Sequence, residues 1–305
     1  MTSKKYKRNT KSRKLKIIKG KRKTQKITKL QCSPTTKKNS YTCYTDEALH
    51  KLRDMWNSKY PNKSIETNES KEIWNALNNN LKTTCKKESC WLKQHFVNYE
   101  SKKKIMDDSF APKSPDSWKK KPNEWLTSSD IEKVMKQYEK AYKCFSFLGP
   151  SPIDFDTKKI YGECVWEKLC HFNLKEQLAK GKTKFGVVFN LDPHYLDGSH
   201  WVSLFVHVKK KMIFYFDSVG TKIPPRIMRF VNTVKTQGQS LGIDFTFDQN
   251  YPVEHQYGNT ECGIYSIFFI VHMLEDKING EYLKTHILKD KYMEKFRKIY
   301  FNSNL

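Results

Sequence analysis

The sequence predicts an α+β protein in which helices come first, a sheet follows and further helices end the chain. Two observations carry this prediction. Apolar residues recur at helical spacing between residues 41 and 148, alternate with a period of two from residue 184, and return to helical spacing after residue 260. The chain has 305 residues, of which 37% are hydrophobic, which supports a substantial core and excludes a disordered chain or a low-complexity fibre.

The first 40 residues differ in composition from the rest. Residues 1–30 contain 14 Lys and Arg and no acidic residue, whereas the other 275 residues carry 43 basic and 32 acidic side chains. A segment with so much charge and so few apolar groups cannot bury a core, so residues 1–40 are predicted to be a disordered basic tail. The tail either aids solubility, acts as a localisation signal, or binds nucleic acid non-specifically through residues 1–30.

Membrane insertion and secretion find no support in the sequence. The longest apolar stretch covers residues 262–274, which is shorter than the roughly 20 residues of a membrane-spanning helix. No apolar block of a secretory signal follows the basic N-terminus. Because the eight cysteines are scattered and no such signal is found, we predict a reducing compartment and free thiols.

Residues 41–123 are predicted to be a helical arm followed by a linker. Prolines at 112, 115 and 122, among charged and small residues, indicate that residues 101–123 are the linker. Cys85, Cys90 and His95 are three potential metal ligands, but their spacing matches no zinc pattern, so no metal site is predicted there. The apolar residues that recur at helical spacing in the arm are Leu49, Leu52, Met55, Trp56, Ile73, Trp74, Leu77 and Leu81.

Residues 124–305 are predicted to form the sheet-containing domain. Strands follow from a period of two, and helices from apolar residues at i, i+3, i+4 and i+7. In chain order, the predicted elements are a helix within 124–148, a buried strand at 184–190, a hairpin of 200–208 with 211–217, a helix from Pro224-Pro225 to Gly238, a strand at 243–247, a buried central helix at 262–274 and a last helix around Met293, Phe296 and Ile299.

Three short segments carry side chains with catalytic potential. His200 stands at the entry to one predicted strand, and Asp217 stands at the end of the next. Because a hairpin brings these two positions to the same end of the sheet, we expect His200 and Asp217 to be neighbours. Cys262 opens the buried helix, where unpaired N–H groups and the helix dipole favour a thiolate. A histidine can take the thiol proton, and a carboxylate can orient that histidine.

Two further residues complete this interpretation. Gln256 offers an amide donor that, together with the Cys262 N–H, can hold a developing oxyanion. Gly263 leaves room for a substrate backbone. Each residue alone has an ordinary structural explanation, so the joint placement carries the argument.

Other residues of the same types are alternatives. His194 in a loop and His207 in mid-strand compete with His200 as the base. Cys164 and Cys170-His171 are interpreted as helix packing.

The order His-Trp, Asp-Ser and Gln-x5-Cys-Gly resembles the Ulp1-type cysteine proteases, the group of SUMO proteases and adenovirus protease. Trp125-Leu126, followed by Ile131, is similar to the Trp-Leu element that opens the catalytic module of that group. Phe189-Asn190 resembles its strand before the catalytic histidine. Within it, the polyprotein-processing proteases of African swine fever virus and of giant viruses such as mimivirus look most similar, through Thr260-Glu261-Cys262-Gly263. This chain departs from the resemblance at one position. The African swine fever virus protease has Asn as its third catalytic residue, whereas Asp217 here is similar to the wider group.

This resemblance implies an α+β, papain-related protease core with a helical N-terminal arm. Cys262 would be the nucleophile, His200 the base and Asp217 the residue that orients it. Gln256 would be the oxyanion donor, and Trp201 would line a narrow groove for the last substrate residues. No metal or other cofactor is expected.

The implied activity is cleavage of viral structural polyproteins after Gly-Gly during virion maturation. The expected location is the virion and, during assembly, the viral factory in the host cytoplasm. The alternatives are a deSUMOylase or deubiquitinase-like isopeptidase, an acetyltransferase with the same His/acid/Cys order, and a non-catalytic basic protein of the virion core.

Overall fold

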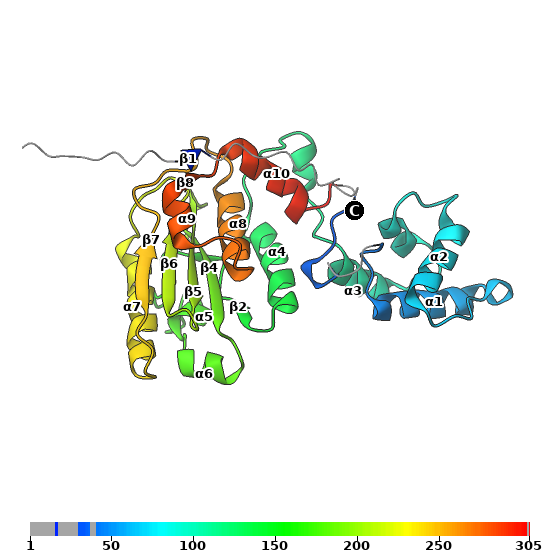
Figure 1. The fold of residues 1–305 in the computed structure, drawn as a ribbon, viewed down its shortest axis with the longest axis horizontal. Coiled ribbons are helices and arrows are strands. Elements are labelled where there is room, and N and C mark those ends of the chain that lie inside the picture. The colour runs from blue at the N-terminus through cyan, green and yellow to red at the C-terminus, as the bar shows by residue number, and fades with distance from the viewer. Residues whose placement is uncertain (1–15, 18–29, 37–40, 304) are drawn as a thin grey trace, which may run out of the picture.

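The computed structural model describes residues 16–17, 30–36, 41–303 and 305. Most of the predicted basic tail therefore lies outside the described residues. Figure 1 shows two parts of the chain, a helical arm and a larger part built around one sheet. Within the described residues, no helix combines the length and the apolar composition that crossing a bilayer requires.

The arm is helical, as predicted. Thr45 caps its first helix by accepting a hydrogen bond from the Ala48 N–H. Its core is separate from that of the sheet and includes the fully buried Tyr44, Trp91 and Phe110. The helices of the arm are α1 (Asp46–Lys59), α2 (Ser70–Leu81) and α3 (Tyr99–Ser109), with short 3-10 turns η1 (Pro34–Thr36), η2 (Pro61–Lys63) and η3 (Glu88–Lys93).

Two predicted boundaries of the arm differ from the structure. Helix α3, which Asn98 caps, occupies the first part of the predicted linker, because Ile105 and Ser109 are buried against the arm. Residues 30–36 were predicted to belong to the tail but pack on the arm, where the Ser33 N–H donates to the Ser109 carbonyl at 2.9 Å. A cross-link to Cys43 fixes this segment, which composition alone does not reveal.

The prediction of free thiols is wrong for six of the eight cysteines, which form disulfides, while Cys144 and Cys262 are free. The prediction of a reducing compartment was made together with that of free thiols, and six disulfide-bonded cysteines do not support it. The pairs form because turns and short helices bring cysteines that are 5 to 11 positions apart into contact. They are Cys32–Cys43, Cys85–Cys90 and Cys164–Cys170.

One six-stranded sheet organises the rest of the chain. Its strands lie in the order β2, β4, β5, β6, β7, and β3 also pairs with β4. The predicted hairpin is confirmed, because β5 pairs with β6 in antiparallel register and β4 pairs with β5 in the same way. The strands are β2 (Phe145–Phe147), β3 (Ser151–Pro152), β4 (Lys184–Asn190), β5 (Trp201–His207), β6 (Met212–Phe216) and β7 (Thr246–Gln249).

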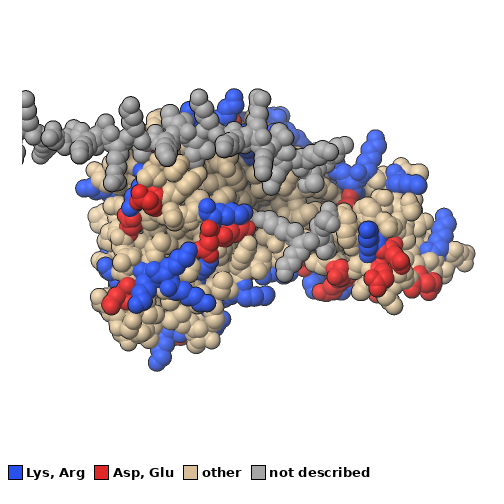
Figure 2. Space-filling view, in the orientation of Figure 1, with Lys and Arg blue, Asp and Glu red and all other residues tan. Residues whose placement is uncertain are grey.

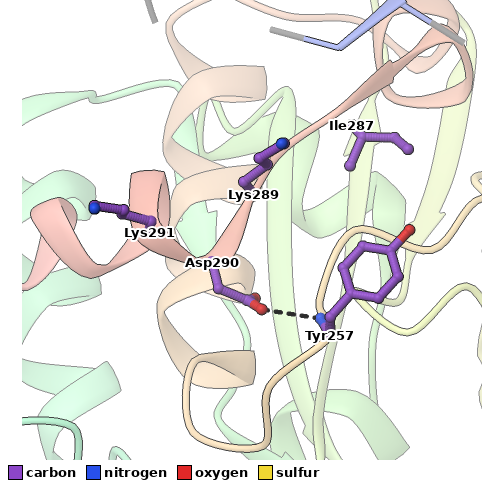
Figure 3. A pocket seen from close by; sticks show the side chains of 5 residues that line it. All are labelled: Tyr257, Ile287, Lys289, Asp290 and Lys291. Atoms are coloured by element: carbon purple, nitrogen blue, oxygen red, sulfur yellow. Dashed lines mark hydrogen bonds between the residues drawn. The ribbon is translucent and has the colours of Figure 1, made fainter. Parts of the chain in front are cut away.

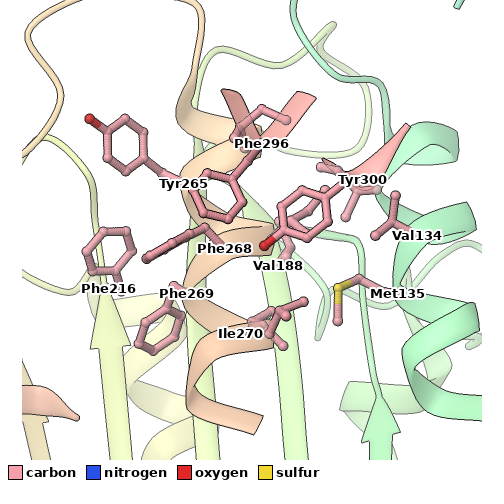
Figure 4. Packing of buried hydrophobic residues seen from close by; sticks show 14 of the residues in the cluster. Val134, Met135, Val188, Phe216, Tyr265, Phe268, Phe269, Ile270, Phe296 and Tyr300 are labelled. Carbon is pink, nitrogen blue, oxygen red and sulfur yellow. The ribbon is translucent and has the colours of Figure 1, made fainter. Parts of the chain in front are cut away.

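Helices cover both faces of the sheet (Figure 1). Helix α8 packs on β5 and contacts α4 and α10, and Figure 4 shows Phe216, Phe268 and Phe269 within this core. The opposite face is covered by α5, α6 and α7. The helices of this part are α4 (Ser128–Ala141), α5 (Glu167–Cys170), α6 (Leu174–Ala179), α7 (Pro225–Gln239), α8 (Cys262–Leu274), α9 (Gly280–Thr285) and α10 (Asp290–Tyr300). The remaining elements are η4 (Asp116–Lys119) and the paired strands β1 (Lys16–Ile17) and β8 (His286–Ile287).

The apolar run at residues 262–274 forms the buried helix that the sequence predicts, with identical bounds. Two details differ. Helix α7 continues past Gly238, which is required there because a Cβ would lie 2.6 Å from the Phe245 ring. The strand predicted at residues 243–247 lies later, at β7, where it pairs in parallel with β6.

Candidate active site

His200 and Asp217 meet at one end of the β5–β6 hairpin, as predicted. The Nε2 of His200 lies 2.7 Å from Oδ1 of Asp217. Asp217 follows β6 directly and is fully buried, whereas the His200 side chain keeps 17% of its surface exposed. Because Nε2 is bonded to the carboxylate, Nδ1 is the ring nitrogen left to face another group.

Further hydrogen bonds fix the Asp217 residue. The Val219 N–H donates to Oδ1 at 3.0 Å, and the Thr221 hydroxyl donates to Oδ2. The buried Asn250 side chain accepts from the Asp217 N–H at 2.9 Å and donates to its carbonyl at 2.7 Å. The carboxylate is therefore held in one orientation toward His200.

The charges of this pair are mutually reinforced. Burial opposes a charged His200, but its interactions with Asp217 and with Cys262 outweigh burial and raise the pKa of His200 to about 9. Burial likewise opposes a charged Asp217, and the hydrogen bond to His200 nevertheless lowers the pKa of Asp217. At neutral pH the arrangement therefore favours an imidazolium next to a carboxylate.

Cys262 begins α8, and its thiol interacts with the His200 side chain. Its thiol is free and only 2% of the residue is exposed. The position at the N-terminus of a 13-residue helix favours a negative charge on the sulfur. His200 is thus the residue at which the carboxylate of Asp217 and the sulfur of Cys262 converge.

The space beside Gly263 is filled by Leu126. A Cβ at residue 263 would lie 2.9 Å from the Leu126 Cβ, so the glycine is needed for packing. The glycine thus has a packing role, and the expectation that it also makes room for a substrate backbone stays a prediction. Leu126 comes from the segment before α4, whose position next to the helix start could not be read from spacing.

Gln256 is buried beside the site and both ends of its amide are engaged. Its Oε1 accepts from the Ser218 hydroxyl at 2.7 Å, and its Nε2 donates to the Gly258 carbonyl at 2.8 Å. Since Nε2 carries two hydrogens, a second N–H remains for another acceptor. Ser218 directly follows Asp217 in the chain, so one loop both carries the Asp217 carboxylate and orients the Gln256 amide.

The loop after Gln256 is tied to the start of α10. Asp290 accepts hydrogen bonds from the Tyr257 N–H at 3.0 Å and the Gly258 N–H at 2.8 Å. Figure 3 shows the contact between Asp290 and Tyr257 at a pocket that is also lined by Ile287, Lys289 and Lys291. The Tyr265 hydroxyl of α8 donates to the same carboxylate at 2.9 Å. Asp290 thereby connects α10, the Gln256 loop and α8.

Trp201 lies in the core cluster that also contains Cys262. Only 7% of the residue is exposed, and its indole N–H donates to the Leu126 carbonyl at 2.9 Å. The ring can therefore present no more than an edge to a bound chain. Trp125, which precedes Leu126 in the sequence, is in contrast 42% exposed.

The two competing histidines have other partners. His194 pairs with Asp154, with Nδ1 and Oδ2 2.7 Å apart. His207 is buried, and burial, followed by Lys184 and Lys210, lowers the pKa of His207 to about 4. Neither interaction involves the free thiols.

Comparisons with known proteins agree with this geometry. Residues 187–304 match the model of the Ulp1 protease family, C-terminal catalytic domain. The chain carries a Ulp1-family cysteine protease domain. His200, Asp217, Gln256 and Cys262 all fall within the matched residues.

Viral proteases are among the relatives of this chain. A thiol protease of Acanthamoeba polyphaga mimivirus is 29% identical over 208 residues, which cover 67% of this chain and 64% of the relative. The chain thus spans less than two thirds of that relative. A cysteine protease of African swine fever virus is 27% identical over 240 residues, which cover 74% of this chain and 86% of the relative. A third relative, from another isolate of that virus, is named a SUMO-1 cysteine protease and has the same identity and coverage.

A solved structure shares the fold. The crystal structure of the African swine fever virus protease superposes with a TM-score of 0.62 and 21% sequence identity. It covers 90% of this chain and 96% of that one, so the similarity includes the arm as well as the Ulp1-family domain.

Sequence reasoning missed several residues that shape the site of this Ulp1-family domain. Thr221 and Asn250 orient Asp217 but lie 4 and 33 positions away in the sequence. Arg297 of α10 is buried and bonds Glu261, the residue before Cys262, at 2.9 Å. A signal was present for Arg297, because it is an arginine on the apolar face of an otherwise amphipathic helix.

Proposed function

We propose that this chain is a thiol endopeptidase of a large DNA virus that cleaves structural polyproteins after Gly-Gly during virion maturation. The observation that carries the proposal is the position of His200, held by Asp217 through Nε2 and in contact with Cys262. A thiolate–imidazolium pair of this kind is the reactive form of a cysteine protease. The buried location of Asp217 keeps its carboxylate aimed at the histidine.

The proposed reaction has two stages. The Cys262 sulfur attacks the peptide carbonyl carbon, the C–N bond breaks, and His200 gives its proton to the leaving amine. A thioester then joins the substrate to Cys262. His200 removes a proton from water, which attacks the thioester carbonyl, and the acid product leaves as the sulfur is released. Atoms and charges balance with no metal or cofactor in the cycle.

The developing oxyanion requires donors. We assign this role to the second N–H of the Gln256 amide and to the backbone N–H of Cys262 at the start of α8. The Ser218 hydroxyl fixes the amide by donating to its oxygen, so Nε2 has a defined direction. Such preorganised donors contribute roughly 10²–10³-fold to turnover.

The Gly-Gly preference is proposed from the resemblance and from the crowding near the nucleophile. Cys262, Trp201 and Leu126 belong to one packed cluster. A substrate chain that reaches the buried sulfur must pass close to this cluster, and residues without a Cβ do so with least displacement. Trp201 is assigned to the wall of that groove, with the small edge that it exposes.

The proposed partners are structural polyproteins and, through residues 1–30, nucleic acid bound without sequence specificity. On the face shown in Figure 2, basic and acidic side chains of the described residues are interspersed over the arm and the sheet part. The segment with basic and no acidic side chains is residues 1–30, whereas the other 275 residues carry 43 basic and 32 acidic side chains. We propose that the protease works in the virion and in the viral factory of the host cytoplasm.

An isopeptidase acting on a ubiquitin-like modifier is the second candidate, because one relative is named a SUMO-1 cysteine protease. The chemistry is the same and only the substrate differs. The two are separated by measuring kcat/KM for an unfolded Gly-Gly peptide, for the same peptide with Ala-Ala, and for a SUMO fusion. If the chain is an endopeptidase, it should cleave the Gly-Gly peptide efficiently and the Ala-Ala peptide poorly. Cleavage of the SUMO fusion far above every peptide would replace the proposal with the isopeptidase.

A further inference from the structure

A second group of side chains with metal-binding potential lies in the segment of chain that connects β3 to β4, apart from the His200 site. Within the described part of the chain, Cys164, Cys170 and His171 are the one group of three such residues whose potential ligand atoms all lie within 4.8 Å of one another. The two sulfurs form a disulfide in the structure, with Cα atoms 6.2 Å apart. The interpretation of these residues as simple helix packing is therefore incomplete.

The spacing of these atoms suits one metal ion. Zinc binds thiolate sulfur at about 2.3 Å and imidazole nitrogen at about 2.0 Å in tetrahedral geometry, which places the two ligand atoms roughly 3.5 Å apart. The Sγ of Cys164 lies 3.8 Å from Nε2 of His171. Two zinc-bound sulfurs are roughly 3.8 Å apart by the same geometry. Rotation about the cysteine side-chain bonds provides that separation once the disulfide is opened.

The backbone around the group holds it in place. Cys170 is the last residue of α5 and His171 follows as its C-cap, so these two ligands share one rigid turn. Cys164 approaches from a β-bridge with Lys158, and its N–H donates to Oε1 of Glu167 at 2.7 Å. The ligands therefore come from two segments that are already fixed to each other.

One neighbouring cation favours the thiolate of the reduced form, and a neighbouring carboxylate lies within reach of the same metal. The Lys158 ammonium lies 3.1 Å from the Cys164 sulfur, and a cation at that distance stabilises a thiolate. The Oε2 of Glu167 lies 3.0 Å from the His171 Nε2. A carboxylate in this position either completes the coordination as a fourth ligand or leaves that place to water.

We propose that Cys164, Cys170 and His171 form a zinc site when their disulfide is reduced. Two molecules of a thiol reductant donate two electrons and two protons to the disulfide and become a disulfide themselves, leaving two cysteine thiols. Zinc then replaces the two thiol protons, which are released to water, and takes Nε2 of His171 as a third ligand. Zinc is favoured over harder ions because the donors are sulfur and imidazole nitrogen.

Zinc at this site would stabilise the segment between β3 and β4, which supports the loop that leads to His200 and β5. Asp154, at the start of the same segment, accepts a hydrogen bond from the His194 N–H at 2.9 Å. His194 belongs to the loop between β4 and His200. Zinc at residues 164–171 would therefore cross-link the support of this loop in reducing surroundings, as the disulfide does in oxidising ones.

The test measures metal content, independent of protease activity. The full chain is reduced with tris(carboxyethyl)phosphine under nitrogen, mixed with zinc chloride, passed through a desalting column, and measured for zinc per chain by mass spectrometry. Wild-type protein is expected to retain one zinc that Cys164→Ser does not retain. Cys85→Ser is the matched control, because the Cys85–Cys90 pair has the amide of Gln94 beside its sulfurs instead of an imidazole.

His171→Ala provides a second variant that does not threaten folding, since the His171 side chain is 64% exposed. Its zinc affinity, measured by competition with a chelator, is expected to fall at least tenfold, because even outer partners of metal ligands contribute roughly 10–100-fold. Equal zinc in wild-type protein and Cys164→Ser would overturn the proposal. Unchanged affinity in His171→Ala, or an equal loss in Cys85→Ser, would also overturn it.

Discussion

Arg297 and Glu261 form a buried ion pair directly before Cys262. The Nε of Arg297 lies 3.0 Å and 2.9 Å from the two carboxylate oxygens of Glu261, and both residues are at most 5% exposed. The other nitrogens of the guanidinium donate to the Glu124 carbonyl at 2.7 Å and to the Thr260 carbonyl at 3.1 Å. One side chain thereby joins α10, the segment before α4 and the residues that lead into α8.

We expect Arg297→Met to destabilise the fold by about 3–5 kcal/mol, because it leaves the Glu261 carboxylate buried without its partner. Burial already raises the pKa of Glu261 despite Arg297, so the loss should be smaller in acid, where Glu261 takes up a proton. Urea unfolding at pH 5 and pH 8 measures this. Lys298→Met, an exposed neighbour on the same helix, is the control and should change stability little. Equal stability of the two variants would show that the pair does not hold the loop.

His200 should titrate far above a normal histidine. NMR titration is expected to give a pKa of about 9 in the wild type, and lower values in Asp217→Asn and Cys262→Ala, since both partners raise it. His207, with a pKa of about 4, serves as the internal control and should not move. A His200 pKa that is the same in all three proteins would contradict the proposed contacts.

The raised pKa of His200 also sets a pH dependence of stability. A histidine whose pKa is higher in the folded state stabilises the fold fully below its unfolded value of 6.5, and this contribution disappears as pH rises through about 9. Asp217 acts in the opposite range, because its lowered pKa makes its contribution disappear in acid. We expect Cys262→Ala to reduce the alkaline loss of stability, as seen in urea unfolding between pH 6 and pH 10. An identical alkaline loss in both proteins would remove Cys262 from the interaction.

The sequence predicted the hairpin and the helix at Cys262 because each follows from a local apolar period. His200 and Asp217 could be paired for the same reason, since 17 residues of hairpin determine their distance. Arg297 and Asn250 could not be found in this way, because they reach the site from elements 36 and 33 positions away from their partners. The three disulfides escaped prediction because composition does not say which cysteines approach each other.

The narrow groove makes a prediction about specificity. For peptides that end in Gly-Gly, Ala-Gly or Gly-Ala before the scissile bond, kcat/KM should fall steeply when either glycine is replaced, because the clash persists in the transition state. Trp201→Ala should narrow these differences and slow the Gly-Gly peptide, since the ring also anchors Leu126. Similar rates for the three peptides in the wild type would be incompatible with a narrow groove.

Removing residues 1–29 should weaken nucleic-acid binding without changing peptide cleavage. These residues carry all 14 basic side chains of the first 30, whereas Leu30 packs on the arm and is kept. Binding of the full chain to a DNA duplex should fall steeply with salt, and the shortened chain should show a shallower slope. Equal slopes would mean that these residues do not contact the polyanion.

The most direct test of the central claim is to label the chain with a peptide electrophile that ends in Gly-Gly and to locate the adduct by mass spectrometry. The two free cysteines provide a matched pair, because Cys144 is more exposed than Cys262 but has no contact with His200. The account predicts one adduct, on Cys262, in the wild type and in Cys144→Ala, and no adduct in Cys262→Ala or in a folded His200→Ala. Labelling of Cys144, or undiminished labelling in His200→Ala, would contradict it.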